Sequence, residues 1–410
     1  MEVAMSATDN PFRAGMALPP PVIAGREPYL GEIKTLMDNA RRTGDAARTR
    51  VFIGPRGVGK TVLLNAWRDR ARDRGWIATR LAADHNPDRS VLATLVANYQ
   101  DLIQQLGRRG RPNTKTLTAT LDLSLGPLNA TITRPSQSID PATVDQTIRR
   151  LGAAAAKARS GIYLALDDLQ AAALDELSTI AKMIQTATTE RLPVVVAGAG
   201  LPELRDRAPH DTSITFTERV TWTTIGALSP ADTAQALLEP FRQGGWKLEP
   251  DAAQHIVELS EGYPYLVQML GSCAWDLAAG TRHLTVGDVN EASQRALDEL
   301  DDGMYRIRWN RCSPTERAYL GAMARIIRDT QREEVTGREV ADRVGREPKQ
   351  LSAIRQRLID KHVIESVDSV HATIRFTLPL YDRYVLQRAE PSARTQRSRW
   401  IKPPRPGLDL

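Results

Sequence analysis

The chain has 410 residues and a formal net charge of +6, with 41% apolar and 25% charged residues. This composition is ordinary for a globular protein and excludes an intrinsically disordered chain, while the length predicts two or three domains. The sequence has no run of about 18 apolar residues that would span a membrane. The first residues lack the apolar segment of a secretory signal, and two cysteines cannot form a disulfide framework. We therefore expect a cytoplasmic protein that does not enter a membrane.

The positive charge is concentrated in the C-terminal quarter. Residues 303–410 contain 22 lysines and arginines against 13 aspartates and glutamates, a net charge of +9, whereas residues 1–302 carry a net charge of −3. A local excess of this kind favours a polyanionic partner such as nucleic acid. The alternative is a charged surface that serves solubility alone.

The order of patterns along the chain predicts an α/β protein with additional helical parts. Short apolar runs such as 193–197 alternate with amphipathic stretches such as 90–106, which predicts a mostly parallel sheet with helical crossovers. A long helical pattern follows, and after it come helices, two short β-like runs and a basic, proline-rich end. The expected parts are an extended N-terminal segment (1–27), an α/β core (28–228) with a hairpin-like insertion at about 107–137, a helical domain (229–302), a winged helix-turn-helix domain (303–388) and a disordered basic tail (389–410).

The strongest motif is GPRGVGKT at residues 54–61, which fits the phosphate-binding loop (P-loop) pattern G-x-x-x-x-G-K-[ST]. It follows an apolar run and opens a predicted helix, so backbone N–H groups and the helix N-terminus would face phosphate oxygens. Lys60 would contact the β and γ phosphates, and the Thr61 hydroxyl would ligate Mg²⁺. The alternative is a glycine-rich turn between a strand and a helix. The predicted nucleotide-binding residues of this loop are Gly54, Pro55, Arg56, Gly57, Val58, Gly59, Lys60, Thr61 and Val62.

A P-loop ATPase also needs acidic residues at the end of another buried strand. The apolar run 162–166 ends in Asp167 and Asp168. We predict that Asp167 holds Mg²⁺ and that Asp168 is the base that orients the attacking water. Two acidic residues that merely end a strand and suit the dipole of the next helix are the alternative.

Five segments that occur in order over about residues 10–388 resemble a known family. They are GREPYL (25–30), GPRGVGKT (54–61), LDDLQ (166–170), LPVVVAGAGLPEL (192–204) and EGYPYLVQMLG (261–271). Together they are similar to bacterial AAA+ and STAND-type ATPases related to origin-recognition and archaeal initiator ATPases. The resemblance implies an ATP- and Mg²⁺-dependent switch in which the helical domain is a lid over the nucleotide.

The resemblance implies further roles for single residues. Gly25 and Arg26 would lie beside the adenine, although a simple helix-start turn explains them too. Pro264 would bring the lid over the nucleotide, and a helix kink is the alternative. Arg219 would be an arginine finger that reaches the γ-phosphate of a neighbouring subunit, or else an arginine that pairs with a nearby carboxylate.

The chain departs from the family pattern at three places. Asp168 stands where relatives commonly have glutamate, and the shorter side chain moves a water-orienting carboxylate. Residues 198–200 and Tyr265 stand where relatives carry polar or arginine sensor residues. These departures predict slow hydrolysis of ATP.

The C-terminal block predicts a second functional element. A capping box at 313–316 starts one helix, residues 336–344 form a second helix, and a tight glycine turn leads to a third helix at 348–362 that is followed by a hairpin. This order is typical of a winged helix-turn-helix, whose third helix enters the major groove of duplex DNA. The predicted DNA contacts are Lys349, Arg355, Arg346 and Arg375. The alternative is a STAND-type scaffold in which this domain controls homo-oligomerisation or binds a partner protein without DNA.

Overall fold

The computed structural model describes most of the chain and divides it into two compact units. The described residues are 10–15, 18–44, 49–84, 86, 90–109, 140–202, 204–205, 220–301, 305–330, 332, 334–368, 373–378 and 380–389. The α/β unit contains residues 15–19 and 25–226, and the helical unit contains residues 1–14, 20–24 and 227–410. Each unit is described by itself below.

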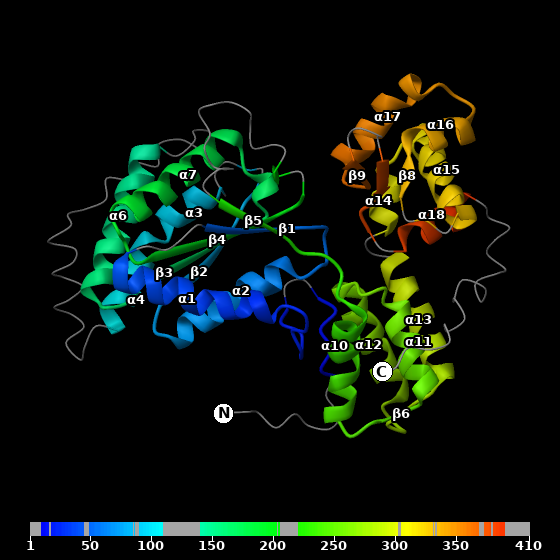
Figure 1. Ribbon diagram of the computed structural model, residues 1–410, viewed down its shortest axis with the longest axis horizontal. Helices are drawn as coiled ribbons and strands as arrows, with labels where there is room; N and C mark the ends of the chain where they lie inside the picture. The colour runs from blue at the N-terminus through cyan, green and yellow to red at the C-terminus, as the bar shows by residue number, and fades with distance from the viewer. Residues whose placement is uncertain are drawn as a thin grey trace. The chain divides into compact units, whose positions relative to one another are not determined.

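The α/β unit is built on a five-stranded sheet in the order β2-β3-β4-β1-β5 (Figure 1), in which every pairing is parallel. The strands are β1 (Thr49–Ile53), β2 (Ile77–Ala82), β3 (Ile162–Asp167), β4 (Val194–Gly200) and β5 (Val220–Thr224). β3 and β4 are buried along their whole length, as expected for central strands of a sheet that helices cover on both faces. The predicted parallel α/β core is therefore confirmed.

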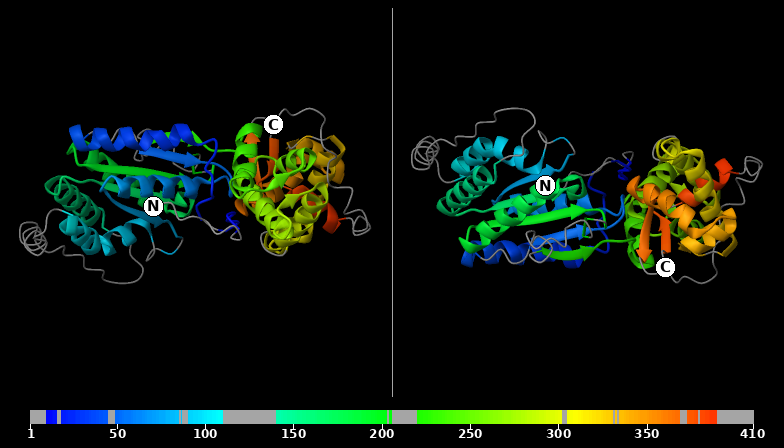
Figure 2. Two further views of the ribbon diagram at one scale, coloured as in Figure 1. Left: turned by 90° about the horizontal axis from the view of Figure 1, so that it is seen from below. Right: turned by 90° about the horizontal axis from the view of Figure 1, so that it is seen from above.

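Helices cover both faces of this sheet (Figures 1 and 2). They are α1 (Glu27–Thr43), α2 (Lys60–Asp73), α3 (Val91–Ala97), α4 (Tyr99–Arg109), α6 (Pro141–Lys157) and α7 (Leu174–Thr189). Successive residues of a strand point to opposite faces. Phe52 accordingly meets Trp67 of α2, with ring centroids 5.4 Å apart, whereas Val51 and Ile53 belong to the apolar core shared with α3, α4, α6 and α7.

Three details differ from the sequence prediction. The stretch 90–106 forms two helices rather than one, because α3 ends at Asn98, a residue type that favours helix ends over helix interiors. The strand predicted at 193–197 continues to Gly200, where its small residues pair in register with β1. The predicted insertion at about 107–137 begins with the last turn of α4, and the rest of it lies outside the described residues.

The helical unit begins with a four-helix group and continues into a smaller mixed domain. The first group consists of α10 (Pro230–Gln243), α11 (Pro250–Leu259), α12 (Pro264–Ala278) and α13 (Val286–Leu300), together with a short parallel strand pair, β6 (Lys247–Leu248) and β7 (His283–Leu284). The sequence pattern showed helices alone here, because two-residue strands leave no detectable period. Phe12, from the N-terminal segment, is buried against Phe241 and Trp275 of this group.

The C-terminal part of the helical unit combines short helices with a three-stranded antiparallel sheet in the order β8-β10-β9. Its elements are α14 (Arg306–Asn310), α15 (Pro314–Thr330), β8 (Val335–Thr336), α16 (Gly337–Val344), α17 (Pro348–Asp360), β9 (Ile364–Asp368), β10 (Thr373–Phe376) and α18 (Tyr381–Ala389). The three helices and the hairpin lie where the sequence predicted them, although α17 ends two residues earlier. The sequence did not predict β8 or α18. Within the described part of the chain, no helix is long and apolar enough to cross a membrane.

Candidate functional site

The candidate site lies at the carboxyl edge of the parallel sheet in the α/β unit. The chain leaves β1 at Ile53, passes through residues 54–59 and enters α2 at Lys60. Asp167 ends β3, and β4 lies between β1 and β3. Because the strands are parallel, the loop and the acidic residues share one edge, the edge where open α/β sheets bind ligands.

Two glycines of the loop cannot be replaced by a residue with a side chain without strain. A Cβ atom at Gly54 would lie 2.0 Å from the carbonyl oxygen of Ile225, so the residue that follows β5 packs directly against Gly54. Gly59 has a φ of +92°, which side chains other than glycine rarely adopt, and it places the first turn of α2. The loop therefore approaches its neighbours closely with backbone alone, as a phosphate-binding loop requires.

The remaining loop residues divide into an anchored and an open part. Val58 is buried in the unit, while Arg56 and Gly57 are exposed. The Lys60 ammonium group donates hydrogen bonds to the carbonyl oxygens of Gly54 and Pro55, at 2.7 Å each. The lysine side chain thus folds back over the loop, where its charge would meet an anion held by the loop. Thr61 and Val62 follow in the first turn of α2 and are half-buried.

Asp167 is the buried carboxylate of the site, with a side chain that is 3% exposed. Its Oδ1 accepts a hydrogen bond from the Asp168 N–H at 3.0 Å. Its Oδ2 accepts no hydrogen bond, and the Arg80 Nε lies 3.5 Å from it. Burial and the neighbouring Asp168 charge raise the pKa of Asp167, against the opposing effects of Thr61 and Arg80. A buried carboxylate oxygen without a hydrogen bond, close to a threonine hydroxyl, fits a hard divalent cation such as Mg²⁺.

Asp168 has a different environment from its neighbour. Its side chain is exposed, and its backbone is left-handed with a φ of +53°. Asp168 Oδ1 accepts a hydrogen bond from the Gln170 side chain at 3.0 Å. The Gln170 Oε1 in turn accepts a hydrogen bond from the Leu201 N–H at 3.1 Å, at the end of β4. The two adjacent aspartates therefore present one buried and one solvent-facing carboxylate.

Sequence reasoning missed two residues of this site. Arg80 lies on β2, which pairs with β3 so that Ala82 is opposite Asp167. A charged residue within a mostly apolar strand was the available signal. Gln170 stands two residues after Asp168 in the LDDLQ segment, and its proximity to the acidic pair was the signal for it.

The structure brings the GRE segment to the same edge as the loop. Arg26 precedes α1, and its guanidinium donates a hydrogen bond to the Gly226 carbonyl oxygen at 2.6 Å. Gly226 directly follows Ile225, the residue that closes over Gly54. Gly25, with a φ of +66°, makes the turn into α1.

Two other predicted residues lie outside the described part of the α/β unit. Arg219 lies outside the described residues. Pro264 belongs to the helical unit, where it is the first residue of α12. At this first position it begins the helix, so the alternative of a helix kink is wrong.

The residues predicted to contact DNA lie on the helical unit and differ in exposure and in ion pairing. Lys349 is exposed in the first turn of α17, Arg346 is exposed in the turn before this helix, and Arg355 is half-buried within it. Arg375 forms ion pairs with Glu365 at 2.5 Å and with Glu334 at 3.8 Å. A phosphate contact by Arg375 therefore requires that these pairs break.

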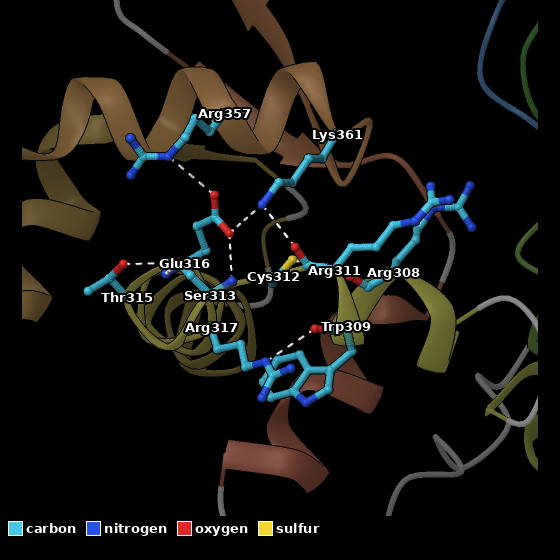
Figure 3. Close-up of polar contacts among 10 residues, drawn as sticks. All are labelled: Arg308, Trp309, Arg311, Cys312, Ser313, Thr315, Glu316, Arg317, Arg357 and Lys361. Carbon is cyan, nitrogen blue, oxygen red and sulfur yellow. Dashed lines mark hydrogen bonds and ion pairs between the residues drawn. The ribbon is translucent and has the colours of Figure 1, made fainter.

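A buried carboxylate organises the cations at the other end of α17 (Figure 3). Glu316, with a side chain that is 1% exposed, accepts hydrogen bonds from the Lys361 ammonium group at 2.6 Å and the Arg357 Nε at 3.4 Å. The side chains of Arg308 and Arg311 extend away from Glu316 in this view. This glutamate ties α15 to α17 and holds two of the cations of the region.

Comparisons with known proteins agree with this geometry. The family described as AAA ATPase domain matches residues 22–197, and a domain of unknown function, DUF8462, matches residues 302–385. No curated protein matches the chain.

Two solved structures share the fold at low identity. The Walker-type ATPase PABY2304 of Pyrococcus abyssi is 16% identical, with a TM-score of 0.55 over 89% of this chain and 96% of that chain. The ORC2 protein of Aeropyrum pernix, in ADPNP–ADP complexes, is 11% identical, with a TM-score of 0.55 over 94% of this chain and 98% of that chain. The predicted P-loop NTPase fold of the α/β unit is therefore confirmed, and the stretch that matches the AAA ATPase domain includes the loop 54–61 and the Asp167–Asp168 pair.

Proposed function

We propose that this chain binds Mg·ATP at the loop 54–61 and Asp167, hydrolyses it slowly, and acts as a nucleotide-controlled switch that associates with duplex DNA. The observation that carries the nucleotide part is the convergence at one sheet edge of the loop, the Lys60 ammonium group and the buried Asp167 carboxylate. Mg²⁺ bound there would neutralise phosphate charge.

Each residue of the site has a separate role in this proposal. Lys60 leaves the loop carbonyls to bind the β and γ phosphates, while Thr61 and the Asp167 carboxylate hold the metal. Asp168 orients the attacking water from its exposed position. Because an aspartate reaches less far than a glutamate, the water is held less well, and this supports slow turnover.

Four further residues complete the nucleotide site in this proposal. Gly25 and Arg26 border the adenine, which the Arg26 bond to Gly226 at the same edge supports. Pro264 starts the helix that brings the lid to the nucleotide. Arg219, which lies outside the described residues, acts on the nucleotide of a neighbouring copy.

The test of nucleotide binding is Lys60→Ala, measured as Kd for a fluorescent ATP analogue and as the rate of phosphate release. A hydrogen bond to a charged group contributes about 1.5–3 kcal/mol, so we expect the Kd to rise about 10- to 100-fold. Lys182→Ala, an exposed lysine of α7, is the matched control. Unchanged binding and turnover in the Lys60 variant would refute the assignment of the loop.

The test of the metal role is Asp167→Asn. Wild-type affinity for ATP should rise when Mg²⁺ is added, whereas the variant should respond much less, because an amide is a weaker ligand for a hard cation than a carboxylate. An equal response to Mg²⁺ in both proteins contradicts the role of Asp167.

The DNA part of the proposal rests on charge and on the order of elements in residues 303–389. We interpret α15, α16, α17 and the sheet as a winged helix whose third helix presents Lys349 at its exposed start, with Arg346 exposed in the turn before it. Affinity for duplex DNA should fall steeply with salt. Lys349→Ala should lower the salt slope by about one, and Lys247→Ala, an exposed lysine of β6, should leave it unchanged.

A specific observation favours a second candidate, a STAND-type scaffold without DNA binding. The C-terminal elements share one continuous apolar core with α10–α13. Arg383 pairs with Glu261 at 3.1 Å, and Arg388 pairs with Asp301 at 3.2 Å. A domain held in this way suits control of homo-oligomerisation or of a partner protein by nucleotide state. Nucleotide-dependent oligomer mass with no DNA binding at low salt would select this candidate.

A further inference from the structure

The Gln170 amide occupies a bridging position between two strands of the α/β unit. It lies in the short 3₁₀ turn Leu169–Ala171 that follows β3, and it is buried. Its Nε2 donates to Asp168 Oδ1 at 3.0 Å, and its Oε1 accepts from the Leu201 N–H at 3.1 Å. One side chain therefore connects the acidic pair with the end of β4.

The Asp168 carboxylate needs such a partner to keep one orientation. The side chain is exposed, and the terminal torsion of an aspartate is broad, so several carboxylate orientations are close in energy. The left-handed backbone of Asp168 and the hydrogen bond from its N–H to Asp167 fix the position of its Cβ atom. The hydrogen bond from Gln170 fixes the orientation of the carboxylate group at the other end of the side chain.

The end of β4 is shaped to admit this amide. Residues 198–200 are Gly-Ala-Gly, so this part of the strand has no polar side chain. A Cβ atom at Gly200 would lie 3.4 Å from Gln170 Oε1 and 2.6 Å from a methyl carbon of Leu204. The strand thus contributes space and a backbone N–H, and the polar side chain between the two strands comes from Gln170.

We propose that Gln170 is a positioning residue that holds the Asp168 carboxylate in the orientation used for hydrolysis, by anchoring it to the end of β4. This inference rests on the proposed ATPase function. It assigns to Gln170 no contact with the nucleotide. A purely structural role, in which the amide only satisfies the buried Leu201 N–H, is the competing explanation.

Two substitutions separate the two hydrogen bonds. Gln170→Glu keeps an acceptor for the Leu201 N–H but replaces the donor to Asp168 with an acceptor of negative charge. Gln170→Met keeps the length of the side chain and removes both hydrogen bonds. Gln185→Glu, an exposed glutamine of α7, is the control for the added charge.

The readouts are kcat, KM, the Kd of the ATP analogue and, in the nucleotide-free protein, hydrogen exchange of the Leu201 amide measured by NMR. A misplacement of about 1 Å costs up to about a hundredfold in rate. We expect Gln170→Glu to lower kcat about 10- to 100-fold with KM and Kd within about twofold, while the Leu201 amide stays protected. Gln170→Met should lower kcat similarly and also expose the Leu201 amide to exchange.

Two results would overturn the positioning role. One is a kcat of Gln170→Glu within about twofold of the wild type while the Leu201 amide remains protected. The other is an equal loss of kcat, nucleotide affinity and Leu201 protection in both variants, which would mark a structural role. Wild-type turnover no higher than that of Lys60→Ala would instead refute the ATPase function itself, and the positioning role with it.

Discussion

The Glu316 side chain provides a stability prediction that the structure makes quantitative. Glu316 is the third residue of α15, and its Oε2 accepts hydrogen bonds from the Ser313 N–H at 2.7 Å and the Lys361 ammonium group at 2.6 Å. Glu316→Gln keeps the capping box, since glutamine serves at this position, but it removes the charge. Glu316→Ala removes both.

The expected loss follows from the exposure of the partners. Breaking a fully buried ion pair costs about 3–5 kcal/mol, but the Lys361 and Arg357 side chains are 33% and 54% exposed, so water replaces their lost partner. Exchanging a charged hydrogen bond of about 1.5–3 kcal/mol for a neutral one of about 0.5–1.5 leaves a loss of about 1–2 kcal/mol for Glu316→Gln. Glu316→Ala should lose about 1 kcal/mol more through the cap.

The chain supplies its own control. Glu339 forms the same capping box with Thr336 at the start of α16, and its ion pair is with Arg332. The Glu339 side chain is 34% exposed, and exposed pairs contribute about 0–1 kcal/mol. Glu339→Gln should therefore cost much less than Glu316→Gln.

Amide hydrogen exchange over α15 and α17 in the full chain measures the effect locally, which avoids the assumption of two-state unfolding for a protein of several domains. A loss of 1–2 kcal/mol corresponds to a fall in protection of about 5- to 30-fold. If Glu316→Gln lowers protection no more than Glu339→Gln, the buried charge does not stabilise the joint between α15 and α17.

The stability difference between the wild type and Glu316→Gln should also depend on pH. Burial alone would raise the pKa of Glu316, but the hydrogen bonds from Lys361 and Ser313 outweigh it and lower the pKa below its ordinary value. A carboxyl whose pKa is lowered on folding stabilises the protein above its unfolded pKa of about 4.3. The difference between wild type and Glu316→Gln should be full at pH 7 and disappear as the pH falls through the lowered pKa.

Three further changes test other parts of the structure. Gly54→Ala should abolish ATP binding, because the new Cβ meets a backbone carbonyl oxygen at 2.0 Å, whereas Gly31→Ala, with nothing within 4 Å, should leave binding unchanged. Burial raises the pKa of the Cys273 and Cys312 thiols to about 11, so alkylation at pH 8 should be slow until denaturant unfolds the chain; fast alkylation of the native protein contradicts this. Phe12→Ala should destabilise the helical unit by about 3–5 kcal/mol, which thermal unfolding would detect; an unchanged Tm would contradict the buried place of this ring.

The sequence predicted the residues whose chemistry has a fixed spacing and missed those that tertiary contacts select. The spacing of Gly54, Gly59 and Lys60 identified the loop, because a strand, a tight turn and a helix N-terminus must follow one another directly. The acidic pair was identified because a buried strand must precede it. Arg80 was missed because its approach to Asp167 arises only when β2 pairs with β3, and Gln170 was missed because its bond to the Leu201 N–H arises only when β4 pairs with β3.

The net charge of the C-terminal quarter also depends on contacts that the sequence alone does not show. The net charge of +9 for residues 303–410 was counted as if their partners lay within the same range. In the folded unit, Arg383 and Arg388 pair with Glu261 and Asp301, which precede that range. The helical domain thus neutralises part of the excess. The cations still exposed at the start of α17 are therefore the decisive ones, and the salt dependence of Lys349→Ala separates DNA binding from a scaffold role more sharply than total charge does.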